Sequence, residues 1–340
     1  MSYKVSIVIL NWNGADMLSS FLPSVVKNSQ GNDIEICVAD NGSTDSSCEV
    51  LQEHFPSVRL IRLDRNYGFA EGYNQALKYV SAKYVVLLNS DIEVTEGWLS
   101  PIVDYMDQHT YVAACQPKIL SYRNRHMFEY AGASGGFIDK YGYPFCRGRI
   151  FDFAETDNGQ YDTPIEIFWA TGAALFIRKD VYDEVGGLDG RFFAHMEEID
   201  LCWRLCSRGY KLMCIPQSVV YHVGGATLKK ENPRKTYLNF RNNLLMLYKN
   251  LPSDELGRVM FVRKLLDFVA AVTFIIKGDL KNAKAVIQAR KDYNTMLPDF
   301  KKDREYNLMK AKSDNIPTRY PFLLVWKNKI LGIKRFSDLS

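Results

Sequence analysis

The sequence predicts an α/β protein whose mostly parallel central sheet is flanked by helices. Within residues 5–88, apolar runs typical of strands alternate four times with segments of helical pattern, and short loops join them. This alternation is typical of parallel sheets built from right-handed β-α-β crossovers. The run 84–88 is apolar throughout, which indicates a strand buried on both faces in the middle of such a sheet.

The elements of the first half follow in a regular order. Strands are expected at 5–10, 34–39, 58–63 and 84–88. Asp16 is an N-cap type residue for a helix that ends near residue 28. Ser43 or Thr44 is suited to cap a second helix that ends near residue 54, and a third helix is expected to end near residue 81.

Beyond residue 90 the pattern is less regular. A helix is expected at 96–108, and strands are expected at 112–119, 168–177, 211–215 and 219–221. The segment 121–163 is rich in Gly, Tyr and Arg and weakly periodic, which is typical of a functional loop or a small hairpin subdomain. From residue 233 the pattern is helical, with helices expected at 234–250, 254–277 and 279–296.

The charge is distributed unevenly along the 340 residues. Residues 1–228 contain 19 Lys/Arg and 28 Asp/Glu (net −9), residues 229–340 contain 24 and 11 (net +13), and the two sum to +4. A basic region on an acidic body indicates an anionic partner, either nucleic acid or a phospholipid surface; the alternative is a solvated basic helical face. The aromatic, apolar and basic segment 320–329 suits a membrane interface or a docked C-terminal segment.

Several classes of protein are disfavoured. The seven cysteines include no CxxC pair, so reduced, mostly buried thiols and a cytoplasmic setting are expected. No secretory signal is recognisable, and the apolar run 265–276 is too short to span a bilayer. The first strand is followed by Asn-Trp-Asn-Gly at 11–14 rather than by the glycine pattern of a dinucleotide fold, and no Gly-rich Lys-Ser/Thr phosphate loop exists.

Polar residues at the ends of strands and helices form the candidate site. Asp91 follows the strand 84–88 at the edge where open α/β sheets bind ligands. It is therefore a candidate ligand of a divalent cation; the alternative is that it only helps to form a turn. Three carboxylates lie within four positions at the start of an apparent helix: Glu197, Glu198 and Asp200. One of them is a candidate general base; the alternative is that they complement the helix dipole. A lone histidine such as His222 is more often structural than metal-binding.

Taken together, the motifs resemble glycosyltransferase family 2, and most of all its rhamnosyltransferase-like branch of bacterial polysaccharide biosynthesis. The matching motifs are 5–13, 40–45, 66–74, 87–91, 172–178, 197–204 and 222–225. They cover about residues 3–250 in the order of the family. The resemblance implies a GT-A nucleotide-diphospho-sugar transferase fold, with a catalytic domain at 1–228 (donor half about 1–120, acceptor half about 121–228) and a basic, mainly helical region at 229–340.

The resemblance also implies a role for individual residues. Asp40 would accept a hydrogen bond from the pyrimidine base of a UDP- or dTDP-sugar, and Asp91 and His222 would bind Mn²⁺ or Mg²⁺. Glu198, or its neighbour Glu197, would deprotonate the acceptor hydroxyl, which attacks the anomeric carbon and inverts it. The other donor-binding residues expected are Asn11, Asn13, Asn66, Asn74, Asn89 and Ser90, and those on the acceptor side are Trp169, Thr171, Gly172 and Asp200.

Three positions depart from the family pattern. The metal motif is Asn-Ser-Asp at 89–91, the usual Glu-Asp pair is Glu197-Glu198, and Tyr73 stands where an arginine often precedes Asn74. The expected partners are the nucleotide-sugar, a glycan or polyprenyl-linked acceptor and an anionic surface on the inner face of the membrane, and not nucleic acid. The rival functions are a sugar-nucleotide nucleotidyltransferase and a non-catalytic glycan- or lipid-binding scaffold.

Overall fold

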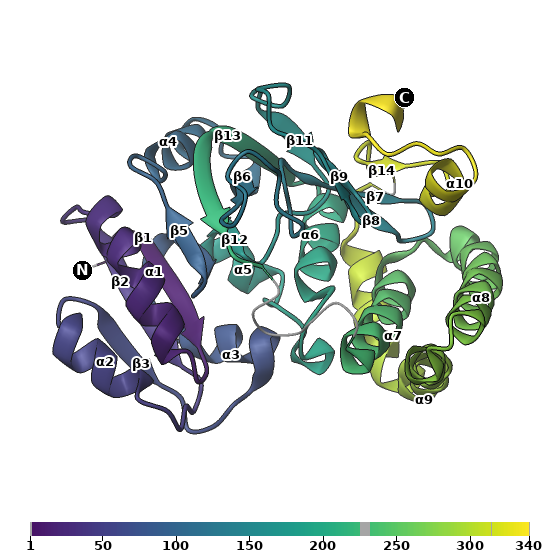
Figure 1. Cartoon of the computed structure of the whole chain (residues 1–340), viewed down its shortest axis with the longest axis horizontal. Coiled ribbons are helices and arrows are strands. Elements are labelled where there is room, and N and C mark those ends of the chain that lie inside the picture. Colours follow the sequence, from purple (N-terminus) through teal and green to yellow (C-terminus); the bar gives the residue numbers. More distant parts are fainter. Residues whose placement is uncertain (1, 225–231, 314, 340) are drawn as a thin grey trace.

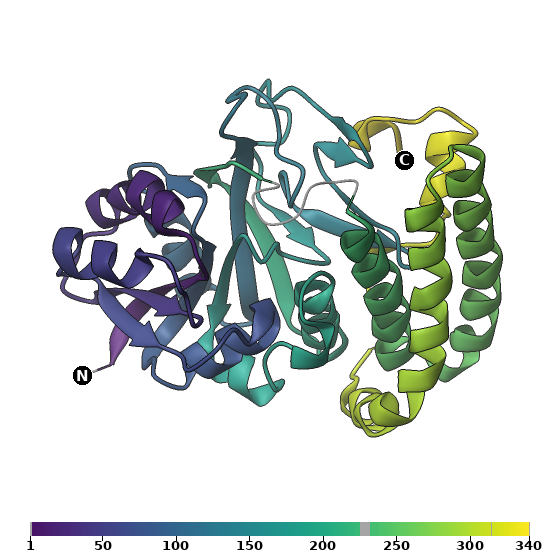
Figure 2. The ribbon, with the colours of Figure 1, turned by 60° about the horizontal axis from the view of Figure 1, so that its bottom comes forward.

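The computed structural model describes residues 2–224, 232–313 and 315–339. A nine-stranded sheet runs through the middle of the molecule, with a smaller five-stranded sheet beside it and a group of long helices at the C-terminal side (Figure 1). The same three parts are seen from another direction in Figure 2. The observed elements agree with the predicted α/β class.

The N-terminal half of the large sheet is parallel, in the order β4-β1-β2-β3. Its elements are β1 (Tyr3–Asn11), α1 (Ala15–Asn28), β2 (Ile34–Asp40), α2 (Ser47–His54), β3 (Arg59–Arg62), α3 (Gly68–Leu77) and β4 (Ala82–Asn89). The predicted fourfold alternation is confirmed. Since β1 and β4 are central and apolar, their middle residues are fully buried, and the polar ends of the strands meet at one edge.

The other half of the large sheet is mixed. β12 lies antiparallel to both β4 and β6, β13 lies parallel to β6, and β11 and β5 lie antiparallel to β13. The elements here are β5 (Ile92–Val94), α4 (Ser100–Gln108), β6 (Val112–Ser121), β11 (Ile165–Ile167), β12 (Ala174–Arg178), α5 (Lys179–Glu184), the 3₁₀ turn η1 (Gly190–Phe192), α6 (Glu197–Ser207) and β13 (Lys211–His222).

Two strand predictions in this half are wrong in detail. The segment predicted as one strand at 168–177 is a strand only from Ala174, because residues 168–173 form the loop that carries the predicted acceptor-side residues. The strands predicted at 211–215 and 219–221 are one strand, β13, whose register against β6 shifts between Ile215 and Val219. An irregularity of this kind interrupts the apolar pattern without ending the strand.

The small sheet confirms the predicted hairpin subdomain. It consists of β7 (Gly136–Asp139), β8 (Pro144–Cys146), β9 (Arg149–Ile150), β10 (Phe153–Ala154) and, from the C-terminal segment, β14 (Arg319–Tyr320). β14 pairs in parallel with β7. The ring of Phe137 lies 5.6 Å from that of Tyr320 and 5.0 Å from that of Phe336. The aromatic C-terminal segment is therefore docked on the protein over much of its length.

The C-terminal helices are α7 (Pro233–Asn250), α8 (Ser253–Ile276), α9 (Leu280–Lys310) and α10 (Leu324–Lys329), followed by the 3₁₀ turn η2 (Phe336–Leu339). The third predicted helix is longer than expected. Its extension past Pro298 is held because Phe300 is buried and Arg304 donates to the carbonyl oxygen of Leu251 at 2.7 Å. Among the described residues, none of the helices is both long and apolar enough to cross a membrane.

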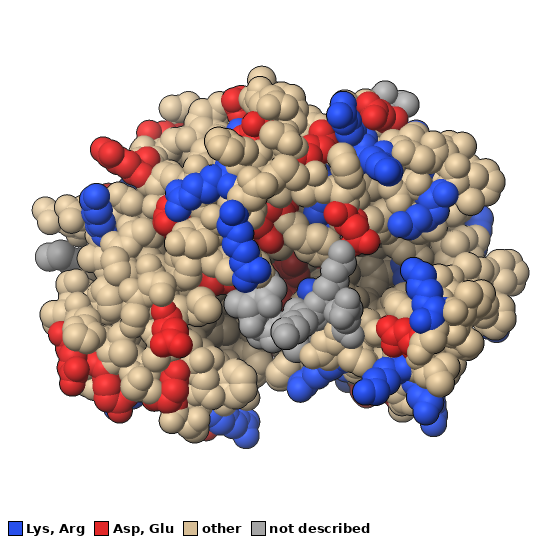
Figure 3. Space-filling view, viewed as in Figure 1, with Lys and Arg blue, Asp and Glu red and all other residues tan. Residues whose placement is uncertain are grey.

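One hydrophobic cluster joins these helices to the acceptor half, and it includes Trp203, Leu244, Phe300 and Leu324. The predicted boundary between residues 228 and 229 lies outside the described residues, so the domain division stays a prediction. All seven cysteines are free thiols and five are buried, as expected. In Figure 3, acidic side chains gather over the region of α2 at the lower left, whereas basic ones surround the C-terminal helices at the right.

Candidate active site

The carboxyl ends of β1 and β2 bring Asn11 and Asp40 together. The register of the two strands pairs these residues directly, and Asn11 Nδ2 lies 3.3 Å from Asp40 Oδ1. The Ser43 amide donates to the other oxygen of Asp40 at 3.0 Å, and the Thr44 amide donates to Asn13 Oδ1 at 2.7 Å. Ser43 and Thr44 therefore order this loop instead of capping α2, which begins at Ser47. Asn11 Oδ1 is buried without a hydrogen-bond partner.

The loop before α3 joins the same cluster. Asn66 Oδ1 accepts from the Gly68 amide at 2.8 Å and from Asn41 Nδ2 at 3.2 Å. Gly68 has φ +78°, and a Cβ on it would lie 2.6 Å from the ring of Phe193. This position requires glycine because both the left-handed backbone and the aromatic ring exclude a side chain. Asn66 is thus held next to the Asn11 and Asp40 loops.

Asp91, His222 and Glu129 form a buried line at the end of β4. Asp91 lies in the turn between β4 and β5, and His222 is the last residue of β13. His222 Nε2 is 3.1 Å from Asp91 Oδ1, and His222 Nδ1 is 3.3 Å from Glu129 Oε2. Although burial opposes the charged form, hydrogen bonds with both carboxylates raise the pKa of His222 to about 10. Burial likewise opposes ionisation of Asp91, but His222 lowers the pKa of that carboxyl.

The spacing of Asp91 and His222 suits a divalent cation. Two ligands at right angles around Mg²⁺, each at about 2.1 Å, lie about 3 Å apart, which is close to the 3.1 Å between His222 Nε2 and Asp91 Oδ1. Within the described residues there is no group of three or more His, Cys, Asp or Glu side chains arranged to hold a metal. A cation held here by two side chains would take its other ligands from water and substrate phosphates, as Mg²⁺ commonly does.

Glu197 and Glu198 open α6 directly after a strained segment. Phe193, His195 and Met196 have φ values of +66°, +70° and +72°, which are uncommon for residues with a Cβ. Asn242 of α7 holds this segment, since its Nδ2 donates to the carbonyl oxygens of Phe192, Ala194 and His195 at 3.0, 2.9 and 2.7 Å. Strain that the surrounding structure maintains in this way is typical of functional sites.

The carboxylates of Glu197 and Glu198 lack part of their possible hydrogen bonds to the described residues. Oε2 of each is buried and has no hydrogen-bond partner in the part of the chain that the structure describes. Burial raises the pKa of Glu198 to about 7, and burial together with the charge of Glu198 raises the pKa of Glu197 well above its ordinary value. Glu197 is almost fully buried, whereas Glu198 is partly exposed. Of the two, Glu198 is therefore the carboxylate that a substrate reaches.

The loop 168–173 connects the Glu198 region to the end of β4. A Cβ on Gly172 would lie 3.1 Å from the ring of Phe69 and 3.8 Å from the Cβ of Glu198. The backbone N–H of Asn89 donates to the carbonyl oxygen of Ala173 at 2.9 Å. Asn89 and Ser90 are half-buried beside Asp91. Two adjacent residues at the end of this loop, Gly172 and Ala173, thus lie beside Glu198 and beside the Asn89–Asp91 turn, respectively.

Three predicted site residues make hydrogen bonds within the protein. Both polar atoms of the Asn74 amide are bonded inside the protein, to Glu71, Tyr182 and Leu188. The Trp169 indole donates to the carbonyl oxygen of Phe137, and its ring covers Gly136. Asp200 accepts from Arg204, Lys249 and Asn250. The donor role of Asn74 and the acceptor-side roles of Trp169 and Asp200 stay predictions. Thr171 is buried, and its hydroxyl accepts from the Ala173 amide.

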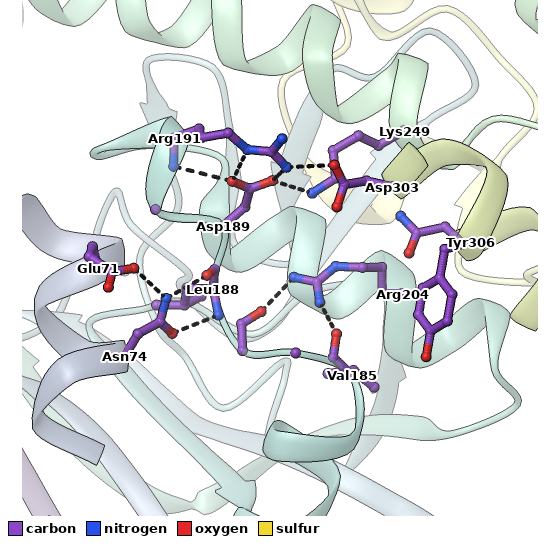
Figure 4. Close-up of a pocket in the computed structure, with 14 residues that line it drawn as sticks. Glu71, Asn74, Val185, Leu188, Asp189, Arg191, Arg204, Lys249, Asp303 and Tyr306 are labelled. Carbon is purple, nitrogen blue, oxygen red and sulfur yellow. Dashed lines mark hydrogen bonds and ion pairs between the residues drawn. The ribbon is translucent and has the colours of Figure 1, made fainter. Parts of the chain in front are cut away.

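Asn74 lies at the edge of a polar depression of about 310 Å³ near Asp189 (Figure 4). Lys249 and Arg191 both point toward Asp189, with Nζ–Oδ2 and Nη2–Oδ2 distances of 2.8 and 2.6 Å. Burial opposes ionisation of Asp189, yet these two cations lower its pKa. The depression lies where α3, α6, α7, α9 and the segment 185–191 meet, and Lys249 and Arg191 neutralise Asp189 there.

The structure also reveals residues that sequence patterns did not indicate. Glu129 lies in the weakly periodic segment 121–163, where nothing in its surroundings distinguishes it from a surface glutamate. Asn242 lies in a helical run beside Asn243; two adjacent asparagines are unusual inside a helix, since both are poor helix formers. These two poor helix formers inside a helix are the sequence feature that could have pointed to a special role of Asn242.

Comparisons with known proteins agree with this geometry. The sequence profile described as "Glycosyl transferase family 2" matches residues 6–186. The chain is 24% identical over 240 residues to N-acetylglucosaminyl-diphospho-decaprenol L-rhamnosyltransferase of Mycobacterium tuberculosis, covering 65% of this chain and 76% of that protein. It is 23% identical over 227 residues to rhamnosyltransferase WbbL of Escherichia coli, covering 64% and 83%.

A further relative is much longer than this chain. The O-antigen biosynthesis protein RfbC of Myxococcus xanthus is 26% identical over 234 residues, which make up 67% of this chain and 18% of RfbC. Among solved structures, GalNAc-T7 with UDP, GalNAc and Mn²⁺ superimposes with a TM-score of 0.59 at 15% identity, covering 93% of this chain and 58% of that chain. Staphylococcus aureus TarS (residues 1–349) superimposes with a TM-score of 0.57 at 14% identity, covering 90% and 87%. The chain has the GT-A fold and belongs to glycosyltransferase family 2.

Proposed function

We propose that this glycosyltransferase moves a sugar from a UDP- or dTDP-sugar to a hydroxyl of a glycan or lipid-linked acceptor, with inversion, in cell-surface polysaccharide synthesis. The observation that carries the proposal is the pairing of two distant elements around the loop 168–173. Gly172 lies beside Glu198, which is a partly exposed residue, and the adjacent Ala173 accepts a hydrogen bond from Asn89 in the turn that carries Asp91, the partner of His222. The relatives named as rhamnosyltransferases favour a deoxyhexose donor.

The donor half, about residues 1–120, would hold the nucleotide. Asp40 and Asn11 Oδ1, which has no hydrogen-bond partner among the described residues, are acceptors available to the N3–H of a uracil or thymine base. Asn13 and Asn66 shape the adjoining loops through the hydrogen bonds described above. A base read by hydrogen bonds to buried acceptors is discriminated strongly, because a wrong base leaves those acceptors unpaired.

The diphosphate would lie beside the Asn89–Asp91 turn. Asp91 and His222 would hold Mn²⁺ or Mg²⁺, which when bound acts as a Lewis acid that neutralises the leaving nucleoside diphosphate. Glu129, 3.3 Å from His222 Nδ1, orients the imidazole ring so that Nε2 faces Asp91. The solved GalNAc-T7 structure contains UDP and Mn²⁺, which supports a divalent ion in this fold.

Glu198 would act as the general base in the acceptor half, about residues 121–228. Its raised pKa places it near neutrality, where a base both exists in the ionised form and binds a proton well. The deprotonated hydroxyl attacks the anomeric carbon from the face opposite the diphosphate, which inverts that carbon in one displacement. Gly172 and Phe69 lie beside Glu198, and the basic region 229–340 would dock the protein on an anionic membrane surface.

A donor screen tests the proposal. Calorimetry with a panel of UDP- and dTDP-sugars in the presence of Mn²⁺ should find one donor that binds to the wild-type protein and not to Asp91→Ala. Mass spectrometry should then detect hydrolysis of that donor, or transfer from it. Pyrophosphate release from a nucleoside triphosphate and a sugar phosphate would instead indicate a nucleotidyltransferase. Glycan or lipid binding without binding of any donor would indicate a scaffold.

A further inference from the structure

Helix α8 exposes an apolar stripe. Phe261, Phe268 and Ile276 are 63%, 68% and 80% exposed. Leu265, Val269 and Ile275 are also exposed, each by half or more. With about 100° between successive residues, all six side chains fall within an arc of about 120° on one side of the helix. Large apolar side chains that share one exposed face mark an interaction surface.

The opposite, buried side of the same helix carries two charged residues beside the apolar Val259 and Ala271. Arg263 and Asp267 are buried, where they pair with each other at 3.2 Å, and Arg290 of α9 pairs with Asp267 at 2.5 Å. Arg263 also donates to the carbonyl oxygen of Tyr141 at 2.8 Å. The helix therefore turns two charged residues toward the protein and six large apolar residues outward, unlike the usual surface helix in water, whose apolar side chains face the core.

The exposed charges along the stripe have one sign, and the exposed Asp254 lies in the first turn of α8, before the stripe begins. Between residues 258 and 291, all of which are described, the exposed charged side chains are basic: Arg258, Lys264, Lys277, Lys281, Lys284 and Lys291. The acidic residues in this range, Asp267 and Asp279, are not exposed. Leu280 and Ile287 of α9 extend the apolar part of the surface. In Figures 1 and 2, α8 lies at the outer edge of the molecule.

The C-terminal segment continues this surface at one end of α8. Arg319 bonds Glu255 in the first turn of α8 at 2.7 Å, and Figures 1 and 2 show α10 beside that end of the helix. Trp326, Ile330 and Leu331 are exposed by half or more. Indole, apolar and basic groups side by side are typical of the interface between lipid headgroups and acyl chains.

We propose that the outward face of α8, with the start of α9 and α10, docks on the surface of an anionic phospholipid bilayer. The inference rests on the proposed function in that a lipid-linked acceptor would then meet the enzyme at this surface. The apolar stripe enters the headgroup region, while the surrounding lysines contact lipid phosphates. A second copy of the same face is a poor partner, because a symmetric contact would oppose basic residues to basic residues.

The surface is connected to the active site through α7. Asn243 of α7 accepts a hydrogen bond from Arg263 on the inner side of α8. The adjacent Asn242 holds the carbonyl oxygens of the strained segment before Glu197. A bilayer bound to α8 would thus lie one helix away from the residues that position Glu198.

Vesicle co-sedimentation tests the proposal with the full chain. The vesicles consist of phosphatidylcholine with or without phosphatidylglycerol, each at low and high salt. Wild-type protein should bind the anionic vesicles at low salt and release them at high salt. Phe261→Ser/Phe268→Ser and Lys281→Glu/Lys284→Glu should each weaken binding at least tenfold. The matched controls, Tyr79→Ser/Tyr111→Ser and Lys27→Glu/Lys78→Glu, alter exposed residues of the donor half and should bind like the wild type.

Two further measurements keep the outcomes distinct. Thermal unfolding shows that each variant is folded, and calorimetry with the nucleotide-sugar reports the donor site independently of lipid. Absence of wild-type binding to anionic vesicles overturns the docking proposal even where donor binding is intact. Binding that the α8 variant (Phe261→Ser/Phe268→Ser) and the α9 variant (Lys281→Glu/Lys284→Glu) both retain also overturns it. A dimer in sedimentation velocity that the Phe261→Ser/Phe268→Ser variant dissociates overturns it as well. Vesicle binding without donor binding would instead remove the proposed function.

Discussion

His222 Nε2 lies 3.1 Å from Asp91 Oδ1 across 131 positions of the sequence. The pairing of β13 with β5 aligns His222 with Ile92, the neighbour of Asp91, so the sheet itself fixes the distance. Asp91→Ala should lower the affinity for nucleotide-sugar in the presence of Mn²⁺ by about a hundredfold or more, as measured by calorimetry. Glu93→Gln is the control, since Glu93 pairs with Arg125 at the surface; equal losses in both variants would contradict the role of Asp91.

Glu198→Gln should separate binding from chemistry. The amide keeps the size of the side chain but does not accept a proton, so transfer should fall by about 10²–10⁴-fold. Donor affinity should stay within a few-fold of the wild type, because the donor half is unchanged. Single-turnover rates and calorimetry measure the two quantities. Wild-type turnover in Glu198→Gln together with inactivity of Glu197→Gln would transfer the role of base to Glu197.

The raised pKa of Glu198 predicts the pH dependence of the rate. A base with a pKa of about 7 is mostly protonated below that pH. The single-turnover rate should therefore rise about tenfold per pH unit below pH 7 and level off above it. The residual rate of Glu198→Gln should lack this rise. An unchanged pH profile in that variant would show that another group limits the reaction.

The raised pKa of Glu198 also predicts how the free energy of unfolding changes with pH. Between its ordinary pKa of 4.5 and about 7, Glu198 retains a proton in the folded protein that the unfolded chain has released. The folded state binds more protons in that window, so the contribution of Glu198 to the free energy of unfolding decreases as the pH rises. Urea denaturation at several pH values should show a smaller decrease for Glu198→Gln than for the wild type.

Asn242 is predicted to position the loop before Glu197. Asn242→Asp replaces a donor by a carboxylate that faces three carbonyl oxygens. It should lower the free energy of unfolding by about 1–3 kcal/mol and lower kcat more than donor affinity. Asn239→Asp is the matched control, because Asn239 Nδ2 bonds only within its own helix, to the carbonyl oxygen of Lys235. A variant that is destabilised at unchanged kcat would show a purely structural role.

Lys249 is predicted to be essential for stability. It is buried and neutralises Asp189 and Asp200, each at 2.8 Å. Lys249→Met leaves two buried carboxylates with less compensation and should cost about 3–5 kcal/mol in urea denaturation. Lys301→Met removes an exposed pair with Glu305 and should cost less than about 1 kcal/mol. Similar costs for both variants would show that the buried pair contributes little.

The parallel half of the sheet was predictable because its strands are continuously apolar and its loops are short. The mixed half was not, since β12 joins β4 in the antiparallel direction after a gap of more than eighty residues. Strand direction there depends on the path of the whole segment 95–173, and no local pattern records it. The register shift in β13 likewise depends on its contact with β6.

The candidate site was predictable where polar residues end a strand, as at Asn11, Asp40 and Asp91. It was less predictable where side-chain direction decides the role. Asp200 is two positions from Glu198, yet on a helix this separation turns the side chain to another face, and there it meets Lys249. Glu129 and Asn242 act through contacts across the fold, so their roles become visible only when those contacts are known.

The pairing of β14 with β7 constrains how the chain assembles. Residues 319–320 complete a sheet that begins at residue 136, and their segment covers the rings of Phe137 and Phe145. During synthesis the parallel strands β1 to β4 leave the ribosome early and pair among near neighbours. The small sheet, in contrast, waits for almost two hundred further residues, with its aromatic face open. That interval is when a newly made chain is most exposed to aggregation and has most need of a chaperone.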